Sequence, residues 1–153
     1  MANVLLTENF TNNIKLNLKS VSKEEAIIQA GKLLTSLHYV KPGYEQSMLN
    51  REKEFSTYIG SHVAIPHGTD DSIKDILQSG ICILQFPDGI DYDGHVVFFL
   101  IGIACKTEDT LEELLQITDL IINPEKSDQL IFVKNKKDLI QLVNENYQNE
   151  GEI

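Results

Sequence analysis

Apolar residues recur every three or four positions in several segments, the spacing that buries one face of an α-helix. Ser22 and Glu25 begin one such segment with a capping-box pattern, while Pro42 suits the first turn of another. Thr107 and Asn135 are candidate N-caps for two more. The pattern thus predicts four helices, over residues 23–37, 42–51, 108–122 and 136–143.

Strands are predicted where apolar residues run continuously or where short β-branched runs meet at a glycine such as Gly60. The two longest apolar runs do not alternate with polar residues, which is typical of strands covered on both faces. Strands are therefore expected over residues 57–59, 62–65, 81–86, 96–104 and 130–133, with turns at 87–89 and 93–94. Strands that alternate with amphipathic helices predict an α/β domain, with helices on both faces of a mixed sheet.

The 153 residues suffice for one domain, expected over 1–148 with a frayed tail at 149–153. No apolar stretch reaches the roughly 20 residues of a membrane-spanning helix, and the N-terminus lacks the features of a secretory signal. The formal net charge of −10 argues against a surface that binds nucleic acid. Solubility explains this charge as well as attraction to basic partners does. We expect a cytoplasmic protein that binds no nucleic acid and does not insert directly into a membrane.

Metal and redox chemistry find little support in the pattern of ligand residues. Cys82 and Cys105 lie in apolar runs and form no C-x-x-C pair, so both are interpreted as reduced core residues. His62 and His67 are separated by a proline, and no cysteine or paired carboxylate nearby completes a zinc set. The aspartates that follow lack the spacing of a calcium loop. No metal or other cofactor is expected.

His67 is the strongest candidate for chemistry, because it follows an apolar strand in a loop between Pro66 and Gly68. Proline fixes the backbone as it leaves the sheet, and glycine removes a side chain that would crowd the imidazole. A neutral imidazole nitrogen can attack phosphorus when the other nitrogen holds the proton, usually on a carbonyl group. Taken alone, a histidine in one loop is more often a surface residue without a role.

Three further residues could stabilise a phosphoryl group. Arg51 offers a guanidinium fork for phosphate oxygens, although it could equally be a helix C-terminal cation that faces the helix dipole. The backbone amides of Gly68 and Thr69 could form an anion-binding concavity, or this segment could be a plain turn.

An ordered series of segments resembles enzyme IIA of the phosphoenolpyruvate-dependent sugar phosphotransferase system, mannitol/fructose class. The resemblance covers about residues 3–147 and favours the mannitol type. The segments that carry it are 48–52 (MLNRE), 56–60 (STYIG), 63–69 (VAIPHGT), 85–90 (QFPDGI) and 101–104 (IGIA). A single P-H-G would be weak, but the whole series at matching separations favours a functional His67 and Arg51.

The resemblance implies a mixed five-stranded sheet and a phosphotransferase that is phosphorylated on His67, with Nε2 as the attacking nitrogen. In this family the histidine accepts phosphate from the phosphocarrier HPr and passes it to a cysteine of enzyme IIB, which serves the membrane enzyme IIC. Arg51 matches the arginine beside the phosphohistidine. The expected function is therefore phosphoryl transfer for uptake of mannitol or a related sugar. A regulatory phosphoacceptor, in which phosphorylated His67 controls partner binding, is the alternative.

One position departs from the family pattern. Thr110 stands where relatives often have a second active-site histidine, and its hydroxyl can donate to a phosphate oxygen but carries no positive charge. His95 is a weaker candidate that could approach the site from another strand. An acidic rim that steers a basic partner is also hypothesised, formed by Asp70, Asp71, Asp88, Asp91 and Asp93.

Overall fold

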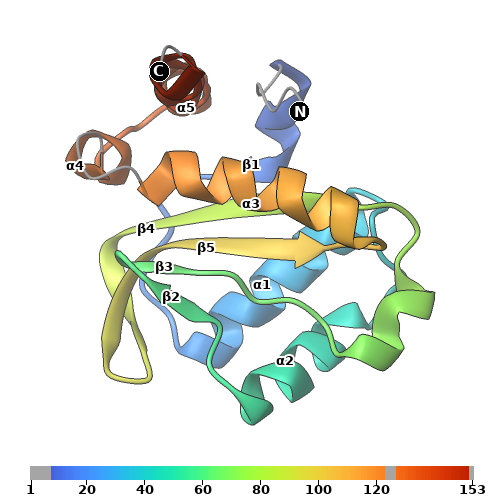
Figure 1. Cartoon of the computed structure of the whole chain (residues 1–153). Helices are drawn as coiled ribbons and strands as arrows, with labels where there is room; N and C mark the ends of the chain where they lie inside the picture. Colours follow the sequence, from blue (N-terminus) through green and yellow to red (C-terminus); the bar gives the residue numbers. More distant parts are fainter. Residues whose placement is uncertain (1–7, 123–126, 152–153) are drawn as a thin grey trace.

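Within the described residues, 8–122 and 127–151, five strands of the computed structural model form one mixed sheet in the order β1-β4-β5-β3-β2 (Figure 1). The strands are β1 (Ile14–Lys15), β2 (Tyr58–Gly60), β3 (Val63–Ala64), β4 (Gly80–Tyr92) and β5 (His95–Ala104). β1 runs parallel to β4 and β3 parallel to β5, whereas the pairs β4–β5 and β2–β3 are antiparallel. The predicted mixed sheet is confirmed.

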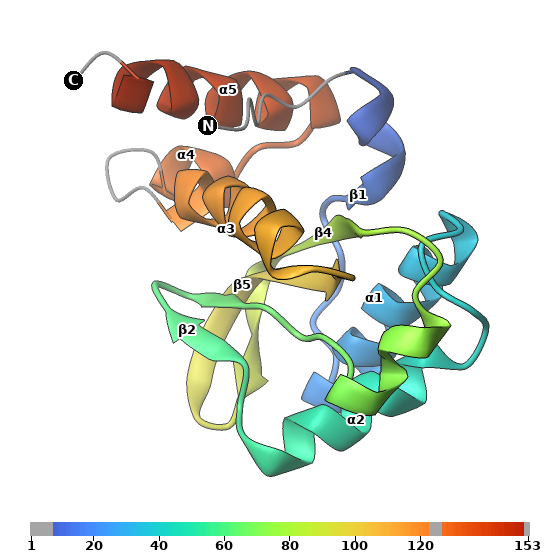
Figure 2. The ribbon, with the colours of Figure 1, turned by 45° about the vertical axis from the view of Figure 1, so that its right-hand side comes forward.

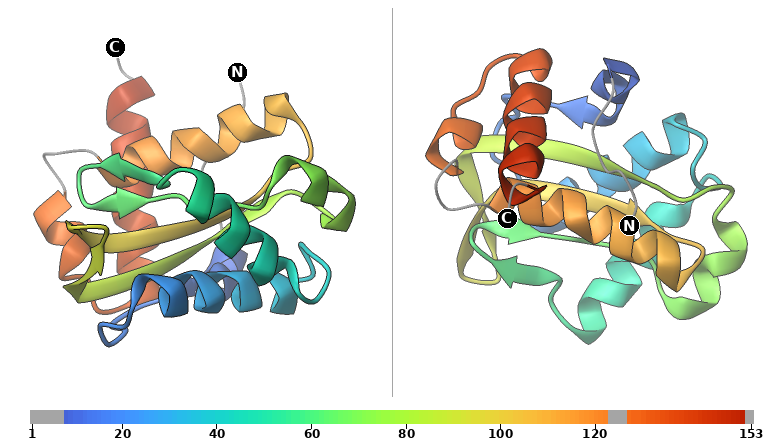
Figure 3. Two further views of the ribbon diagram at one scale, coloured as in Figure 1. Left: turned by 90° about the horizontal axis from the view of Figure 1, so that it is seen from below. Right: turned by 45° about the horizontal axis from the view of Figure 1, so that its top comes forward.

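Helices cover both faces of this sheet, as predicted. The left panel of Figure 3 shows α1 and α3 on opposite sides of β4 and β5, and Figure 2 shows α4 and α5 on the side of α3. The α-helices are α1 (Lys23–Ser36), α2 (Tyr44–Glu54), α3 (Glu108–Ile122), α4 (Ser127–Ile131) and α5 (Lys136–Gly151). Two short 3-10 helices, η1 (Glu8–Asn13) and η2 (Asp70–Asp75), complete the described elements.

The alternation of side chains along β4 explains its continuous apolar sequence. Ile81 and Ile83 belong to the core beneath α3 and α5, while Cys82, Leu84 and Phe86 belong to the core beneath α1. All five are at most 1% exposed, because helices cover both faces of the strand. This double burial makes the centre of the sheet a rigid support for the loops at its edge.

The predicted helix starts are largely confirmed. Ser22 Oγ accepts a hydrogen bond from the Glu25 amide at 3.1 Å, and Asn135 Oδ1 accepts one from the Asp138 amide at 2.9 Å. α3 begins directly after Thr107, and its predicted stop at 123–124 lies outside the described residues. α2 begins at Tyr44 after an N-cap at Gly43, so the placement of Pro42 in its first turn is wrong, and it ends at Glu54, one turn beyond the predicted end. α5 continues through Gly151, into the segment expected to be frayed.

The predicted strand at 130–133 is wrong, because Ser127–Ile131 forms the short helix α4. Leu130 is fully buried against the sheet, and the Gln85 side-chain amide lies within 3.0 Å of the carbonyl oxygens of Leu130, Ile131 and Val133. These carbonyls therefore bond to a side chain of β4 and not to a neighbouring strand. The fifth strand of the sheet is instead β1, which the sequence analysis missed because its two residues are too few to produce a pattern.

The predicted turn at 87–89 is also wrong, since these residues continue β4 past an irregularity between Gln85 and Ile90. The predicted turn at Asp93 and Gly94 is confirmed. Both residues have positive φ, 57° and 91°, which suits a two-residue hairpin between β4 and β5. The hairpin extends away from η2, toward the lower left of Figure 1.

A buried polar network joins the end of α2 to β2 and to the β4–β5 hairpin. Glu52, 8% exposed, accepts hydrogen bonds from the Thr57 amide at 2.9 Å and the Thr57 hydroxyl at 2.7 Å. Lys23 forms ion pairs with both Glu52 and Asp93, and the Tyr92 hydroxyl lies 2.9 Å from that of Thr57. Burial raises the pKa of Tyr92 well above its ordinary value. The network fixes the part of α2 that carries Arg51.

Candidate active site

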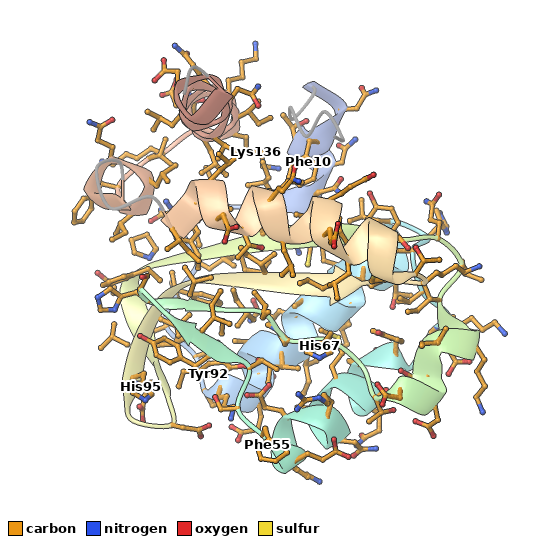
Figure 4. The ribbon with its side chains drawn as sticks, in the orientation of Figure 1. Phe10, Phe55, His67, Tyr92, His95 and Lys136 are labelled. Atoms are coloured by element: carbon orange, nitrogen blue, oxygen red, sulfur yellow. The ribbon has the colours of Figure 1, made fainter. Side chains whose placement is uncertain are left out.

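His67 lies in the loop between β3 and η2, where two parallel strands end. The Ile103 amide donates to the Pro66 carbonyl at 3.0 Å, and His67 itself forms an isolated parallel bridge with Ile103. These contacts extend the β3–β5 pairing by a few residues and place the histidine at the carboxyl ends of both strands, where α/β proteins commonly bind ligands. Figure 4 shows the imidazole in this loop, above α2.

The His67 ring is half-buried and is held by one nitrogen. Nδ1 lies 2.9 Å from the Ile65 carbonyl oxygen. A carbonyl oxygen only accepts hydrogen bonds, so in the neutral form of the ring Nδ1 carries the proton and Nε2 has the lone pair. Within the residues that the structure describes, Nε2 has no hydrogen-bond partner. The ring is thus prepared for nucleophilic attack through Nε2.

A pocket of about 420 Å³ opens beside His67. Its wall is formed by the loop after β3, by η2, by the segment that follows β5 and by the first turns of α3. The apolar lining residues are Ile65, Ile73, Ile76, Ile103, Leu111 and Leu115. The other lining residues are Tyr44, Gly68, Thr69, Asp70, Cys105, Lys106 and Thr107. The imidazole therefore borders a hollow with a largely apolar wall and a polar edge.

The backbone after His67 is attached to α2 by two hydroxyl groups. The Gly68 amide donates to the Tyr44 hydroxyl at 3.0 Å, and the Thr69 amide donates to Ser47 Oγ at the same distance. Tyr44 is buried, which raises the pKa of its phenol. A Cβ on Gly68 would lie 2.6 Å from the Tyr44 oxygen, so glycine is required by close packing. In this arrangement both amides are already paired, and their predicted phosphate-binding role stays a prediction.

Arg51 lies on α2 and does not line the pocket that contains His67. Its Nη1 donates to the Phe55 carbonyl at 3.0 Å, at the C-terminal end of the helix. This contact matches the structural alternative, a cation at the helix terminus. A guanidinium has five N–H donors, so the hydrogen bond leaves several for another ligand. A role in catalysis remains a prediction.

The two other positions suggested beside His67 have different outcomes. Thr110 lies in the first turn of α3, but its side chain lies outside the part of the chain that the structure describes. His95 stacks on Tyr58 with ring centroids 4.3 Å apart, at the hairpin end of the sheet, and does not line the His67 pocket. Figure 4 shows His95 and His67 well separated, so the suggestion that His95 approaches the site is wrong.

The predicted acidic rim is also wrong as one surface, because its members lie at two ends of the molecule. Asp70 and Asp71 belong to η2, beside the pocket. Asp88 and Asp91 belong to β4, and Asp93 lies at its turn into β5. Asp91 accepts a hydrogen bond from the Gly94 amide, and Asp93 pairs with Lys23. Figure 1 shows η2 at the right and the hairpin at the lower left, at opposite ends of the sheet.

The two cysteines differ, although the sequence assigns both to the core. Cys82 is fully buried, and burial raises the pKa of its thiol to about 12. Cys105 is half-buried and lines the His67 pocket, with Sγ 2.8 Å from the Thr107 carbonyl oxygen. The core interpretation holds for Cys82, whereas Cys105, which follows the last residue of β5, packs against the edge of the core and is only partly buried.

The sequence patterns do not single out Tyr44, Ser47 or Lys106. Tyr44 and Ser47 are three residues apart and therefore share a face of α2, which is a usable signal only once the facing loop is known.

Among the described side chains, no group of three or more His, Cys, Asp or Glu residues could hold a metal ion. Likewise, none of the described helices is long and apolar enough to span a membrane.

Comparison with known proteins supports one family throughout. The model of the phosphoenolpyruvate-dependent sugar phosphotransferase system, EIIA 2, matches residues 9–146. The mannitol-specific phosphotransferase enzyme IIA component of Bacillus subtilis strain 168 is 41% identical over 134 residues, which cover 87% of this chain and 94% of the relative.

Solved structures agree with this assignment. The crystal structure of IIA mannitol from Escherichia coli has a TM-score of 0.79 and 32% identity, over 86% of this chain and 96% of that one. A complex of Escherichia coli enzyme IIAMTL with phosphorylated enzyme IIBMTL matches with a TM-score of 0.79 and 31% identity, over 86% and 94%. The chain therefore belongs to the EIIA 2 family of the phosphoenolpyruvate-dependent sugar phosphotransferase system, whose members are phosphotransferase components.

Proposed function

We propose that this protein carries a phosphoryl group on Nε2 of His67, which it accepts from phosphorylated HPr and donates to a cysteine of enzyme IIB. The observation that carries the proposal is the contact between His67 Nδ1 and the Ile65 carbonyl, which leaves the Nε2 lone pair available beside an open pocket. We further propose that it works in the cytoplasm, in the uptake of mannitol or a related sugar.

The first transfer exchanges one nitrogen–phosphorus bond for another. The Nε2 lone pair of His67 attacks phosphorus on the HPr phosphohistidine, and the donor imidazole leaves with the electrons of the broken bond. The donor leaves as a neutral ring when its other nitrogen is protonated. His67 keeps its Nδ1 proton on the Ile65 carbonyl, so the product has one cationic ring and one phosphoryl group. Charge is thereby conserved between the two proteins.

The second transfer uses the same proton. A cysteine thiolate of enzyme IIB attacks phosphorus, the bond between Nε2 and phosphorus breaks, and His67 returns to a neutral imidazole. Because Nδ1 already holds a proton, His67 departs without forming an imidazolate, which would be a poor leaving group. The Ile65 carbonyl thus favours both transfers: in the first it orients His67 as the nucleophile, and in the second it keeps His67 neutral as the leaving group.

Names of relatives support the sugar and the acceptor. The Bacillus subtilis relative is mannitol-specific, and the Escherichia coli neighbour was solved with phosphorylated enzyme IIBMTL. Transport is therefore favoured over the regulatory alternative, and through enzyme IIB the phosphoryl group would reach the sugar handled by the membrane enzyme IIC. Arg51, the amides of Gly68 and Thr69, and the Thr110 hydroxyl are proposed to stabilise the moving phosphoryl group.

Stepwise phosphorylation tests the proposal. The protein is incubated with phosphoenolpyruvate, enzyme I and HPr, and its intact mass is measured before and after addition of enzyme IIB. We expect one acid-labile phosphoryl group that disappears when IIB is added and that never forms on the His67→Ala variant. His95→Ala serves as a matched control and should be labelled normally. Normal labelling of His67→Ala would refute the proposal.

A further inference from the structure

The His67 pocket has an unusual balance of charge for a site that receives a phosphoryl group. Among the described residues, the charged side chains in its wall are Asp70 and Lys106. Asp70 repels a phosphoryl group, which carries close to two negative charges. Arg51, the expected counter-charge, does not line this pocket, and its Nη1 bonds to Phe55. Lys106 is thus the ammonium group placed to compensate the charge.

The backbone at Lys106 is fixed in relation to His67. The histidine forms its bridge with Ile103, and Lys106 follows three residues later in the same segment, just beyond the end of β5. The Lys106 amide donates to Ser79 Oγ at 2.8 Å, which attaches this segment to the start of β4. Cys105 and Thr107, on either side, also line the pocket. The lysine therefore starts from an ordered position at the pocket edge.

The side chain of Lys106 is exposed, and it can move at little cost because its stem is flexible. Among the described side chains, the ion pairs join Lys23 to Glu52 and Asp93, at the other end of the molecule from this pocket. Lys106 takes part in neither of them. An ammonium group is a compact charge with three donors and needs no fixed geometry to meet phosphate oxygens. These properties suit a group that follows phosphorus as it moves from one partner protein to the next.

We propose that Lys106 is a further catalytic residue, whose ammonium group binds the phosphoryl oxygens while phosphorus is attached to, or moving onto, His67. This inference rests on the proposed function of His67. The Lys106 ammonium group acts through its charge and by donating hydrogen bonds, and it forms and breaks no covalent bond. Its attraction lowers the charge repulsion that Asp70 imposes on the incoming group.

The test compares Lys106→Met, which removes the charge at similar length, with Lys106→Arg, which keeps it. Lys74→Met is the matched control, because Lys74 is an exposed lysine of η2 that does not line the pocket. Labelling of His67 is timed with two donors: phosphorylated HPr, and phosphoramidate, a small reagent that phosphorylates imidazole directly. We expect Lys106→Met to be slower by about tenfold with both donors, less than a buried oxyanion donor contributes because Lys106 is exposed.

The remaining variants decide between explanations. Lys106→Arg should restore most of the rate, Lys74→Met should match the wild type, and the Lys106→Met defect should shrink as salt increases. A normal rate for Lys106→Met overturns the proposal. So does a defect seen with HPr alone, since Lys106 would then contact the partner and not the phosphoryl group. Failure of wild type to accept phosphate from HPr would refute the proposed donor, while the phosphoramidate comparison would still judge Lys106.

Discussion

Replacing Tyr44 with phenylalanine should show whether its hydroxyl group positions His67 for catalysis or only stabilises the fold. The change removes one hydroxyl group, which accepts the Gly68 hydrogen bond at 3.0 Å, and leaves the buried ring in place. A buried amide without a partner costs about 1–3 kcal/mol. Total stability of a domain this size is about 5–15 kcal/mol, so the variant should still fold.

Tyr44→Phe should affect the rate of phosphoryl transfer to His67 more strongly than the stability of the fold. Gly68 follows His67 directly, and a displacement of about 1 Å at a reacting group can slow a reaction about a hundredfold. We expect Tyr44→Phe to accept phosphate from HPr at least about tenfold more slowly. Urea unfolding measures the stability and intact-mass time courses measure the transfer rate.

Tyr39→Phe is the matched control for this experiment. The Tyr39 hydroxyl accepts a hydrogen bond from Asn13 Nδ2 at 2.7 Å and does not line the His67 pocket. It should lose a comparable amount of stability but transfer phosphate at the wild-type rate. If Tyr44→Phe also transfers at that rate, α2 does not position His67 and our interpretation of the two hydroxyl groups is refuted.

Three further predictions concern other residues of the site. Arg51→Ala should slow transfer about a hundredfold if the guanidinium contacts the moving phosphoryl group; an effect on urea stability alone, equal to that of Lys53→Ala, would return Arg51 to a helix-end role. Gly68→Ala should lower unfolding stability by about 1–3 kcal/mol, measured by urea titration, because its Cβ would overlap the Tyr44 hydroxyl. A thiol reagent should modify Cys105 and spare Cys82 in the native protein, since burial raises the pKa of Cys82 to about 12; two reactive thiols before denaturation would contradict the assignment.

Local features of the fold could be predicted because their causes are local. The capping residue Ser22 lies three positions from its partner, and the double burial of β4 shows directly as an unbroken apolar run. The structure near residue 130 could not be predicted from the sequence, because its carbonyl groups bond to Gln85, which lies 45 residues away from Leu130. A short apolar segment is compatible with either structure until that contact is known.

The same distinction applies to the site. His67 and the carbonyl that orients it lie two residues apart, so the loop sequence contains most of the nucleophile. The groups that position His67 or add charge beside it come from distant segments. Tyr44 is 24 residues from Gly68, and Lys106 follows both β4 and β5. Sequence spacing cannot bring these together without the strand order of the sheet.

The position of the phosphorus atom on the imidazole tests the central claim most directly. The protein, labelled with ¹⁵N at histidine, is phosphorylated through HPr and examined by nitrogen and phosphorus NMR. We predict that phosphorus is coupled to Nε2 of His67, while Nδ1 retains its proton on the Ile65 carbonyl. Attachment at Nδ1, or on any other side chain, would contradict the account.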